Sequence, residues 1–462
     1  MNLLTDKLLE FALEFKTEDI PQNVIDFQKR VLVDSLGVMN AAATLEPAAK
    51  PFMDLAVSFG GGSSAILGTG LTAPPVMAAM ANGALIHALD YEDGHDASHA
   101  HPNTASIPSI LAFAQAEGKS GKETLAAMVI ASEIAIRLKL SLTGNDLHEC
   151  GWYSPPMFAA YGAVLGLSRL LGFTKEEALD ALSICLTQIS LPGQSAVSRA
   201  SVLRGIREAL SAKAAAFGAE MAGRGVKARM EEPLEGPLGI FMSCFRNMYD
   251  QSVIFEGLGT DWECCRLRFK AWPCCGSSHG VVSALSELVK EHDIRPDEVE
   301  EVHLHVNRPH MNLLEPHDAK YHPQSLAAAK FSLPFTVALV LRDGTVSLRS
   351  YQGDVLNDEM LSHLADLVTY EMFPDGTVIP KGAFPDDFIK VDVRTARGTF
   401  TGETVISPGS PHRPLTDEQI KAKFLDCCSF GTRSFSAEAV YDAIMKLDGC
   451  SDVNELFEIM ND

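Results

Sequence analysis

The chain has 462 residues, of which 46% are hydrophobic and 21% charged, and its 38 Lys and Arg against 60 Asp and Glu give a formal charge of −22. This apolar content excludes a disordered chain, and the absence of a strict Gly or heptad period excludes collagen and coiled coil. The length predicts two or three domains at about 150 residues each. The acidic balance argues against nucleic-acid or anionic-membrane binding, although a few Lys and Arg in a cleft could still bind an acidic substrate.

Two segments were candidates for targeting or membrane insertion. Residues 1–16 mix charged and apolar residues at helical spacing, which predicts an amphipathic helix rather than a signal peptide. Residues 55–89 are uncharged apart from His87, but their glycine run and proline pair indicate loops and helices buried in protein, not a membrane span. The ten cysteines form no Cys-x-x-Cys motif, so we expect reduced thiols, no structural zinc and a cytoplasmic location.

In chain order, the first half predicts helices. Apolar periodicity favours helices over 121–142, 156–171, about 207–223 and 280–292. The second begins with a proline pair and is closed by Gly172, the expected asymmetry of helix ends. The predicted helix over about 207–223 carries small residues that would let another helix approach closely.

After about residue 298 the pattern changes to alternation with period two. Residues 302–306, 389–395 and 399–405 predict strands of an antiparallel sheet, with a helix over 325–340 between them. Residues 415–462 return to helix, starting with a capping signature at Thr416.

These elements predict a mostly α fold with an inserted domain. We expect a large all-helical domain formed by residues 1–265 and 410–462. A smaller α/β (α+β) lid domain with an antiparallel sheet is expected over residues 266–409.

The densest polar segment is 89–103, which holds four carboxylates and three histidines between two apolar stretches. A carboxylate beside an imidazole raises its pKa and orients the ring, as a general acid or base requires. Two other interpretations stay open at this point. The segment could be a solvated acidic loop, or a metal site whose ligands would be His95, Asp96, His99 and His101.

Residues 269–279 form a second candidate segment. Lys270 precedes an aromatic–Pro turn and small residues that lead into a helix, whose N-terminus would attract a carboxylate or phosphate. Cys275 could be a nucleophile there if its pKa were lowered, or a packed thiol.

Arginines and a tyrosine complete the set of candidates. Arg199, Arg204 and Arg207 could hold carboxylates in a bidentate fork, or form surface salt bridges on a helix. Tyr153, just ahead of an apolar helix, could be packing or a phenolic acid.

As an ordered set, several short motifs resemble the MmgE/PrpD family, which includes 2-methylcitrate dehydratase, cis-aconitate decarboxylase and iminodisuccinate epimerase. The resemblance spans nearly the whole chain, and it implies a helical domain with a smaller lid, a homodimer, and no metal or organic cofactor. The motifs are Asn82-Gly83, residues 87–93, His101-Pro102, Gly151-Trp152, Lys270 with residues 272–274, His279, residues 331–335 and Lys423-Phe424.

The resemblance assigns roles residue by residue. Asp90 matches the family's active-site aspartate, His101 its histidine before proline, Lys270 the lysine of its Lys-x-aromatic-Pro loop, and His279 the downstream histidine of that loop.

Four positions depart from the family pattern. Tyr153 stands where a histidine is usual, Arg207 where a lysine is usual, Cys275 where the decarboxylases have another histidine, and Phe335 where they have a tyrosine. Because these changes remove proton-transfer groups of the decarboxylases, the resemblance favours dehydratase chemistry and leaves the substrate open.

The chemistry implied is proton transfer at a carbon next to a carboxylate, with the developing charge held by fixed cations. We expect His101, oriented by Asp90 or Asp93, to be the general base or acid, and Lys270 with Arg207 to clamp a carboxylate. The predicted catalytic residues are His101, Asp90, Lys270, Tyr153 and His279, and the predicted substrate-binding residues are Arg207, Asp93 and Cys275.

We therefore predict a cofactor-free carbon-oxygen lyase that dehydrates or hydrates a small di- or tricarboxylate. The alternatives are an epimerase on the same scaffold, a metal-dependent hydrolase, and a non-catalytic carboxylate-binding protein.

Overall fold

The structure is a computed structural model that describes residues 3–144, 149–198, 201–374, 376–381, 383 and 385–460. Helices make up 57% of the chain and strands 9%, so the predicted mostly α fold is confirmed. No helix in these described ranges is long and apolar enough to cross a membrane. All ten cysteines are free thiols.

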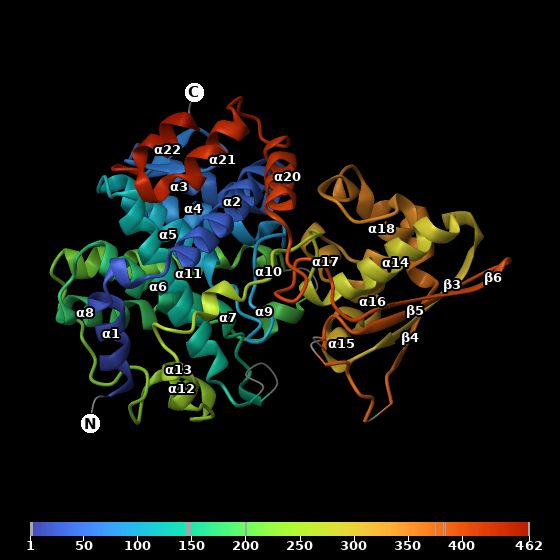
Figure 1. Cartoon of the computed structure of the whole chain (residues 1–462), viewed down its shortest axis with the longest axis horizontal. Helices are drawn as coiled ribbons and strands as arrows, with labels where there is room; N and C mark the ends of the chain where they lie inside the picture. Colours follow the sequence, from blue (N-terminus) through green and yellow to red (C-terminus); the bar gives the residue numbers. More distant parts are fainter. Residues whose placement is uncertain are drawn as a thin grey trace.

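Most helices belong to one large body, with the two ends of the chain on opposite sides of it (Figure 1). The helices of this body are α1 (Leu4–Glu14), α2 (Gln22–Leu45), α3 (Lys50–Ser58), α4 (Pro75–Ala88), α5 (Asn103–Ala116), α6 (Gly121–Leu140), α7 (Pro155–Leu170), α8 (Lys175–Leu186), α9 (Gln194–Val197), α10 (Leu203–Ile206), α11 (Glu208–Gly223), α12 (Ile240–Phe245), α13 (Gln251–Phe255), α20 (Asp417–Cys428), α21 (Ala437–Met445) and α22 (Asn454–Ile459). The hairpin β1 (Ser64–Ile66) and β2 (Leu71–Ala73) precedes α4.

Small residues let the central helices pack closely. A Cβ added at Gly162 of α7 would lie 2.2 Å from the carbonyl oxygen of Ala131 in α6, and one at Gly218 of α11 would lie 2.6 Å from that of Ala181 in α8. The expected close approach to the helix over 207–223 is therefore confirmed. The predicted cap at Thr416 is also confirmed, since its hydroxyl accepts a hydrogen bond from the backbone N–H of Gln419.

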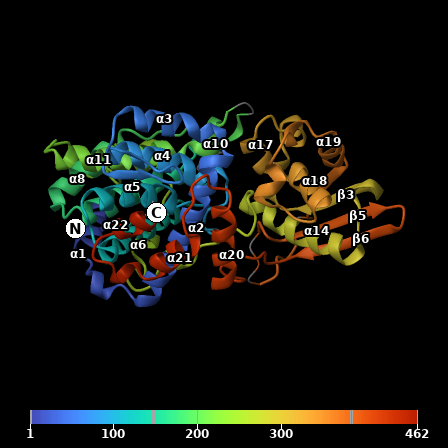
Figure 2. The same cartoon turned by 90° about the horizontal axis from the view of Figure 1, so that it is seen from above.

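The second part of the fold, to one side of the helical body in both views, carries a four-stranded sheet (Figures 1 and 2). Its helices are α14 (His279–His292), α15 (Met311–Leu314), α16 (His317–Tyr321), α17 (Leu326–Lys330), α18 (Leu333–Asp343) and α19 (Glu359–Asp366). Its strands are β3 (Val299–Val306), β4 (Val368–Met372), β5 (Ile389–Thr395) and β6 (Gly398–Thr404), in the order β4-β3-β5-β6.

Two details of this part differ from the sequence prediction. The predicted strands β3, β5 and β6 pair antiparallel, but β4, which was not predicted, pairs parallel with β3. The chain reaches β4 through a long helical crossover, and a crossover connection returns a strand in the same direction. The expected helix over 325–340 is two helices, because Ser332 caps α18 and ends the continuity with α17.

Buried apolar side chains form two separate cores. The first is built from residues 4–269 and 420–460, with Leu348, and the second from residues 274–393. A cavity in the described part of the chain is lined by residues from both stretches of sequence.

Candidate active site

The cavity has a volume of about 1020 Å³ and a cationic lining. Seven Lys and Arg residues line it against three Asp, an excess of positive charge in a chain whose overall charge is −22. The cations are Lys139, Arg204, Arg207, Arg268, Lys270, Arg308 and Lys320, and the carboxylates are Asp90, Asp96 and Asp386. Because clefts of one sign concentrate ligands of the other, this lining favours an anionic ligand.

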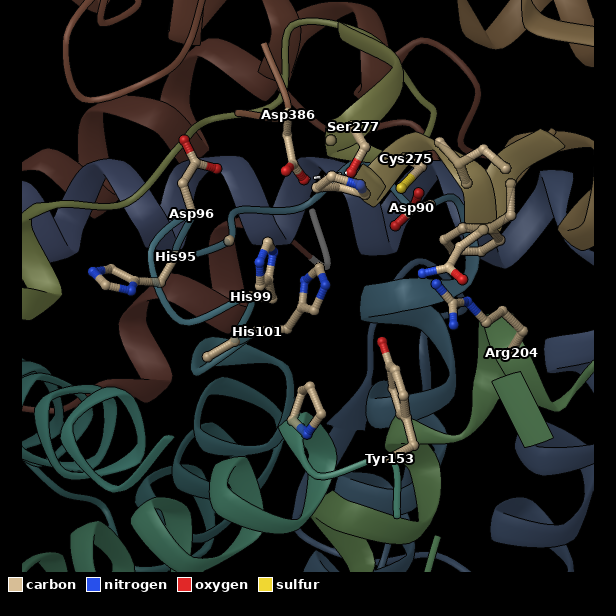
Figure 3. Close-up of a pocket in the computed structure, with 18 of the residues that line it drawn as sticks. Asp90, His95, Asp96, His99, His101, Tyr153, Arg204, Cys275, Ser277 and Asp386 are labelled. Atoms are coloured by element: carbon tan, nitrogen blue, oxygen red, sulfur yellow. Dashed lines mark hydrogen bonds between the residues drawn. The ribbon is translucent and has the colours of Figure 1, made fainter. Parts of the chain in front are cut away.

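Six of the eight predicted site residues line this one cavity: Asp90, His101, Tyr153, Arg207, Lys270 and Cys275. In Figure 3, Tyr153 and Arg204 project into the same space as the imidazole of His101, from different elements.

Lys270 and Asp90 form a buried ion pair. The Nζ atom of Lys270 lies 2.5 Å from Oδ1 and 3.0 Å from the backbone oxygen of Asp90, and both side chains are almost fully buried. Asp90 follows α4 in the left-handed region, with φ +48°, and this turn aims its carboxylate at the lysine. Burial alone would lower the pKa of Lys270, but the charges of Asp90 and Glu92 outweigh it and raise that pKa above its ordinary value. The ammonium therefore stays charged at neutral pH.

Lys423 of α20 holds the two loops of this ion pair together. Its ammonium donates to the backbone oxygens of Tyr91, at 2.7 Å, and Lys270, at 2.9 Å. The carboxylate of Asp34 lies 2.6 Å away and balances its charge. Helix α20 thus fixes the position of a pair of loops that are far apart in sequence.

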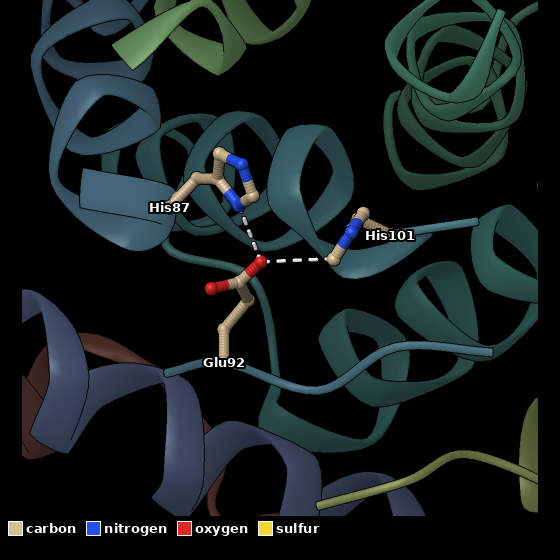
Figure 4. A group of neighbouring side chains, drawn as sticks. All are labelled: His87, Glu92 and His101. Carbon is tan, nitrogen blue, oxygen red and sulfur yellow. Dashed lines mark hydrogen bonds and ion pairs between the residues drawn. The ribbon is translucent and has the colours of Figure 1, made fainter. Parts of the chain in front are cut away.

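His101 is oriented by Glu92, which the sequence analysis did not single out. Oε1 of Glu92 lies 2.9 Å from Nδ1 of His101 and 2.5 Å from Nδ1 of His87 (Figure 4). Since a carboxylate only accepts, both Nδ1 atoms carry the hydrogen, and Nε2 of His101 is left with a lone pair. This is the tautomer that a general base requires.

The charge states of this group follow from burial and contacts. Burial opposes ionisation of Glu92, but the electrostatic effects of His87 and Lys270 and the hydrogen bonds from both imidazoles hold its pKa well below the usual range. Burial lowers the pKa of His87, so that ring is neutral. The expected orientation of His101 by Asp90 is wrong, because the carboxylate of Asp90 binds Lys270. Asp93 does contact His101, but through its backbone oxygen, which accepts from Nδ1 at 3.3 Å, whereas its carboxylate accepts from Asn103 at 2.8 Å.

Arg204, Arg207 and Lys320 are three of the cations that line the cavity. Arg207 donates to the Tyr153 hydroxyl at 3.2 Å, and its Nε lies 3.3 Å from Oε1 of Glu208. The guanidinium of Arg204 lies 4.1 Å from the ring centroid of Phe331, and no described carboxylate pairs with it.

Lys320, from α16, also meets no carboxylate among the residues that the structure describes, and its ammonium donates to the Phe331 backbone oxygen at 2.8 Å. Burial, with the nearby charge of Arg204, lowers the pKa of Lys320 to about 8.

Two predicted site residues lie outside the cavity lining. His279 is fully buried, its Nε2 donates to the Trp272 backbone oxygen at 3.2 Å, and burial with the charges of Arg268 and Lys270 holds its pKa well below the usual range. Asp93 is also buried, and burial raises its pKa to about 7.

Three other residues that the sequence analysis named are Cys275, Phe335 and Arg199. Cys275 lines the cavity, but burial raises the pKa of its thiol, which disfavours a thiolate nucleophile. Phe335 is buried in the second core, away from the cavity. Arg199 lies outside the described residues.

Among the described residues, the four ligands of the alternative metal site in 89–103 do not come together as one group. Asp96 pairs with Arg268 at 2.7 Å, and His95 is bonded to the Ser98 hydroxyl at 2.9 Å. A different group, His87, Glu92 and His101, has ligand atoms within 4.8 Å of one another, and its two histidines line the cavity.

Sequence reasoning missed His87, Glu92 and Lys320 as contributors to this site. His87 and Glu92 lie inside the motif at 87–93, and their five-residue separation across the end of a helix gave no sign that they meet. Lys320 gave no sequence signal, because only the packing of α16 brings it to the cavity.

The protein is mostly α-helical, with two apolar cores and a cavity of cationic lining, and the comparisons give its family. The MmgE/PrpD N-terminal domain matches residues 6–251 and the MmgE/PrpD C-terminal domain matches residues 272–446. The chain belongs to the MmgE/PrpD family.

Curated relatives in the family share about a quarter of their residues with this chain. Cis-aconitate decarboxylase of Aspergillus terreus (strain NIH 2624 / FGSC A1156) is 24% identical, over 99% of this chain and 96% of the relative. Cis-aconitate decarboxylase-like protein oryM of Aspergillus oryzae is 25% identical, over 99% and 97%. Human cis-aconitate decarboxylase is 24% identical, over 96% and 92%.

Proposed function

We propose that this protein is a lyase that acts on a small di- or tricarboxylate by proton transfer at a carbon next to a carboxylate. The observation that carries the proposal is one cavity in which an oriented imidazole, His101, faces cations that no described carboxylate pairs with, Arg204 and Lys320. The relatives, which are decarboxylases by name, support a lyase of this general type.

The roles follow from the contacts. Nε2 of His101 takes the proton from the carbon next to the substrate carboxylate, and the electron pair spreads onto that carboxylate as an enolate-like species. Lys270, Arg207, Arg204 and Lys320 stabilise this charge as fixed cations. Glu92 stabilises the imidazolium that forms, at 2.9 Å from its Nδ1.

In a dehydration, the second half of the reaction needs an acid. The electron pair forms the carbon–carbon double bond, the carbon–oxygen bond breaks, and the hydroxyl leaves as water with a proton from Tyr153 or Lys320. The phenol of Tyr153 lines the cavity and is bonded to Arg207, whereas His279 lies outside the lining. We therefore assign the role of the acid to Tyr153 or Lys320 and not to His279.

We favour dehydration or hydration over decarboxylation because of the residues present. Cys275, which lines the cavity, stands where the family decarboxylases carry another histidine, and Phe335 stands where they carry a tyrosine. No step in this proposal uses a metal or an organic cofactor.

We also propose that residues 1–265 and 410–462 form the helical domain and that residues 266–409 form a lid over the site. The two separate apolar cores support this division, and so does the lining of the cavity by both parts. A homodimer and a cytoplasmic location remain predictions.

The test is a panel of small polycarboxylates, including cis-aconitate, followed by proton NMR in deuterated water. Elimination or hydration changes the product formula, decarboxylation releases carbon dioxide, and epimerisation incorporates deuterium without changing the formula. The proposal expects one substrate to lose or gain water, with turnover abolished in folded His101→Ala and Lys270→Ala. Near-normal rates in both variants would contradict it, and tight binding without turnover or exchange would indicate a carboxylate-binding protein.

A further inference from the structure

The exposed face of the β3–β4–β5 sheet carries a second group of possible ligands, outside the cavity lining. His303 and His305 are two residues apart on β3, so both point to the face opposite Val302, Leu304 and Val306, which are buried in the second core. The parallel register sets Thr369 beside His303 and Glu371 beside His305. We call His303, His305 and Glu371 the sheet triad; their ligand atoms lie within 4.8 Å of one another.

The hydrogen bonds around His303 fix which nitrogen carries its proton. The Thr369 hydroxyl donates to Oε1 of Glu301 at 2.9 Å, so it accepts at its 2.8 Å contact with Nδ1 of His303. In the neutral ring Nε2 is then unprotonated, and it lies 3.9 Å from Oε1 of Glu371.

His305 shows the same arrangement with the roles of its two ring nitrogens exchanged. Its Nε2 lies 2.7 Å from Oδ2 of Asp392, and a carboxylate can only accept there. In the neutral ring Nδ1 is therefore the unprotonated nitrogen, yet it lies 2.9 Å from Oε1 of Glu371. Two acceptors at this distance require a cation between or beside them, either a proton on Nδ1 or a metal ion.

We propose that the sheet triad binds a divalent transition-metal ion of the Zn²⁺ type, with Asp392 and Thr369 orienting its two imidazoles. Two imidazole nitrogens and one carboxylate oxygen are a ligand set that Zn²⁺ takes, with water completing the coordination. An acceptor on the remote nitrogen of each ring is the outer arrangement typical of zinc-bound histidine, because it fixes the tautomer and the ring orientation. The competing account is an imidazolium at His305 held between Glu371 and Asp392.

None of the three ligands lines the catalytic cavity. The inference is therefore independent of the proposed function, and it predicts a metal that stabilises the sheet-containing part of the fold without taking part in turnover.

The experiment is calorimetric titration of the full chain with ZnCl₂ at pH 7.5, after treatment with chelator and dialysis. We expect one equivalent to bind and the thermal midpoint to rise. Binding should be lost in His305→Gln and Glu371→Gln, and Asp392→Asn should weaken it by about 10–100-fold. The matched control is His322→Asn, which removes a surface histidine ion-paired with Asp366 at 3.2 Å and should leave binding unchanged.

His101→Asn separates the sheet triad from the other possible ion site, His87, Glu92 and His101. Loss of zinc in His101→Asn with retention in Glu371→Gln would overturn the proposal, and so would the absence of any binding to the wild-type chain. A Co²⁺ spectrum of the wild-type chain gives a readout that needs no variant. Bands of nitrogen and oxygen ligands are expected, whereas thiolate charge-transfer bands would assign the ion to cysteines and overturn the proposal.

Discussion

The hydrogen bond from His101 to Glu92 gives the sharpest test of the proposed chemistry. Glu92→Gln keeps the shape of the side chain and an oxygen that can accept from both imidazoles. Oε2 of Glu92 has no described partner, so the new amide nitrogen can occupy its place without breaking either bond. The substitution therefore removes the negative charge while keeping the orientation of His101.

The size of the effect can be worked out from the geometry. When His101 takes the substrate proton, its positive charge develops 2.9 Å from Oε1 of Glu92. At an effective dielectric constant of about 20, that attraction is worth up to about 6 kcal/mol, or roughly four powers of ten in rate. General acid–base help is worth about 10²–10⁴-fold. We therefore expect Glu92→Gln to lower kcat by a factor between about 10² and 10⁴.

The assay is steady-state turnover of the polycarboxylate that the NMR panel identifies, together with ¹⁵N NMR of the histidine side chains. The control is Glu133→Gln. Glu133 is equally buried and also accepts two hydrogen bonds, from Arg137 at 2.5 Å and from the Cys264 backbone at 2.9 Å, but it lies outside the cavity lining. A folded Glu92→Gln enzyme with kcat close to that of wild type would refute the assignment of His101 as the base.

Four further predictions address the rest of the site. Tyr153→Phe should lower kcat by about 100-fold if the phenol transfers a proton, and an unchanged kcat would assign the ring to packing. Lys320→Met should raise KM about tenfold or more by removing a charged hydrogen-bond donor to the substrate, which initial rates would measure, and an unaltered KM would exclude contact with it. Lys270→Met should lower the free energy of unfolding in urea by about 3–5 kcal/mol, because it strands the Asp90 carboxylate, and a loss below about 1 kcal/mol would contradict the buried pair. Asp93 has a pKa raised to about 7 in the folded chain, so it binds a proton more tightly there than in the unfolded chain. The free energy of unfolding should therefore fall from about pH 4 to about pH 7, by up to about 1.4 kcal/mol per pH unit. Asp93→Asn should remove this slope in urea unfolding curves, and an unchanged slope would refute the prediction.

The sequence by itself determined the helical character and the positions of several elements. Helix signals such as the cap at Thr416 act within a few residues, and strand alternation at 389–395 depends only on which side chains face the core. The motifs also identified Asp90, His101, Lys270, Tyr153 and Arg207, all of which line one cavity.

Only the tertiary structure decided which carboxylate serves which partner. Within residues 90–93 the sequence offers Asp90, Glu92 and Asp93 as equivalent acids, and the turn after α4 sends each one to a different neighbour: Lys270, the pair of imidazoles, and Asn103. The sequence could not show that His279 lies outside the cavity lining or that Lys320 belongs to it, because burial and access to a cavity depend on how segments distant in the chain pack together.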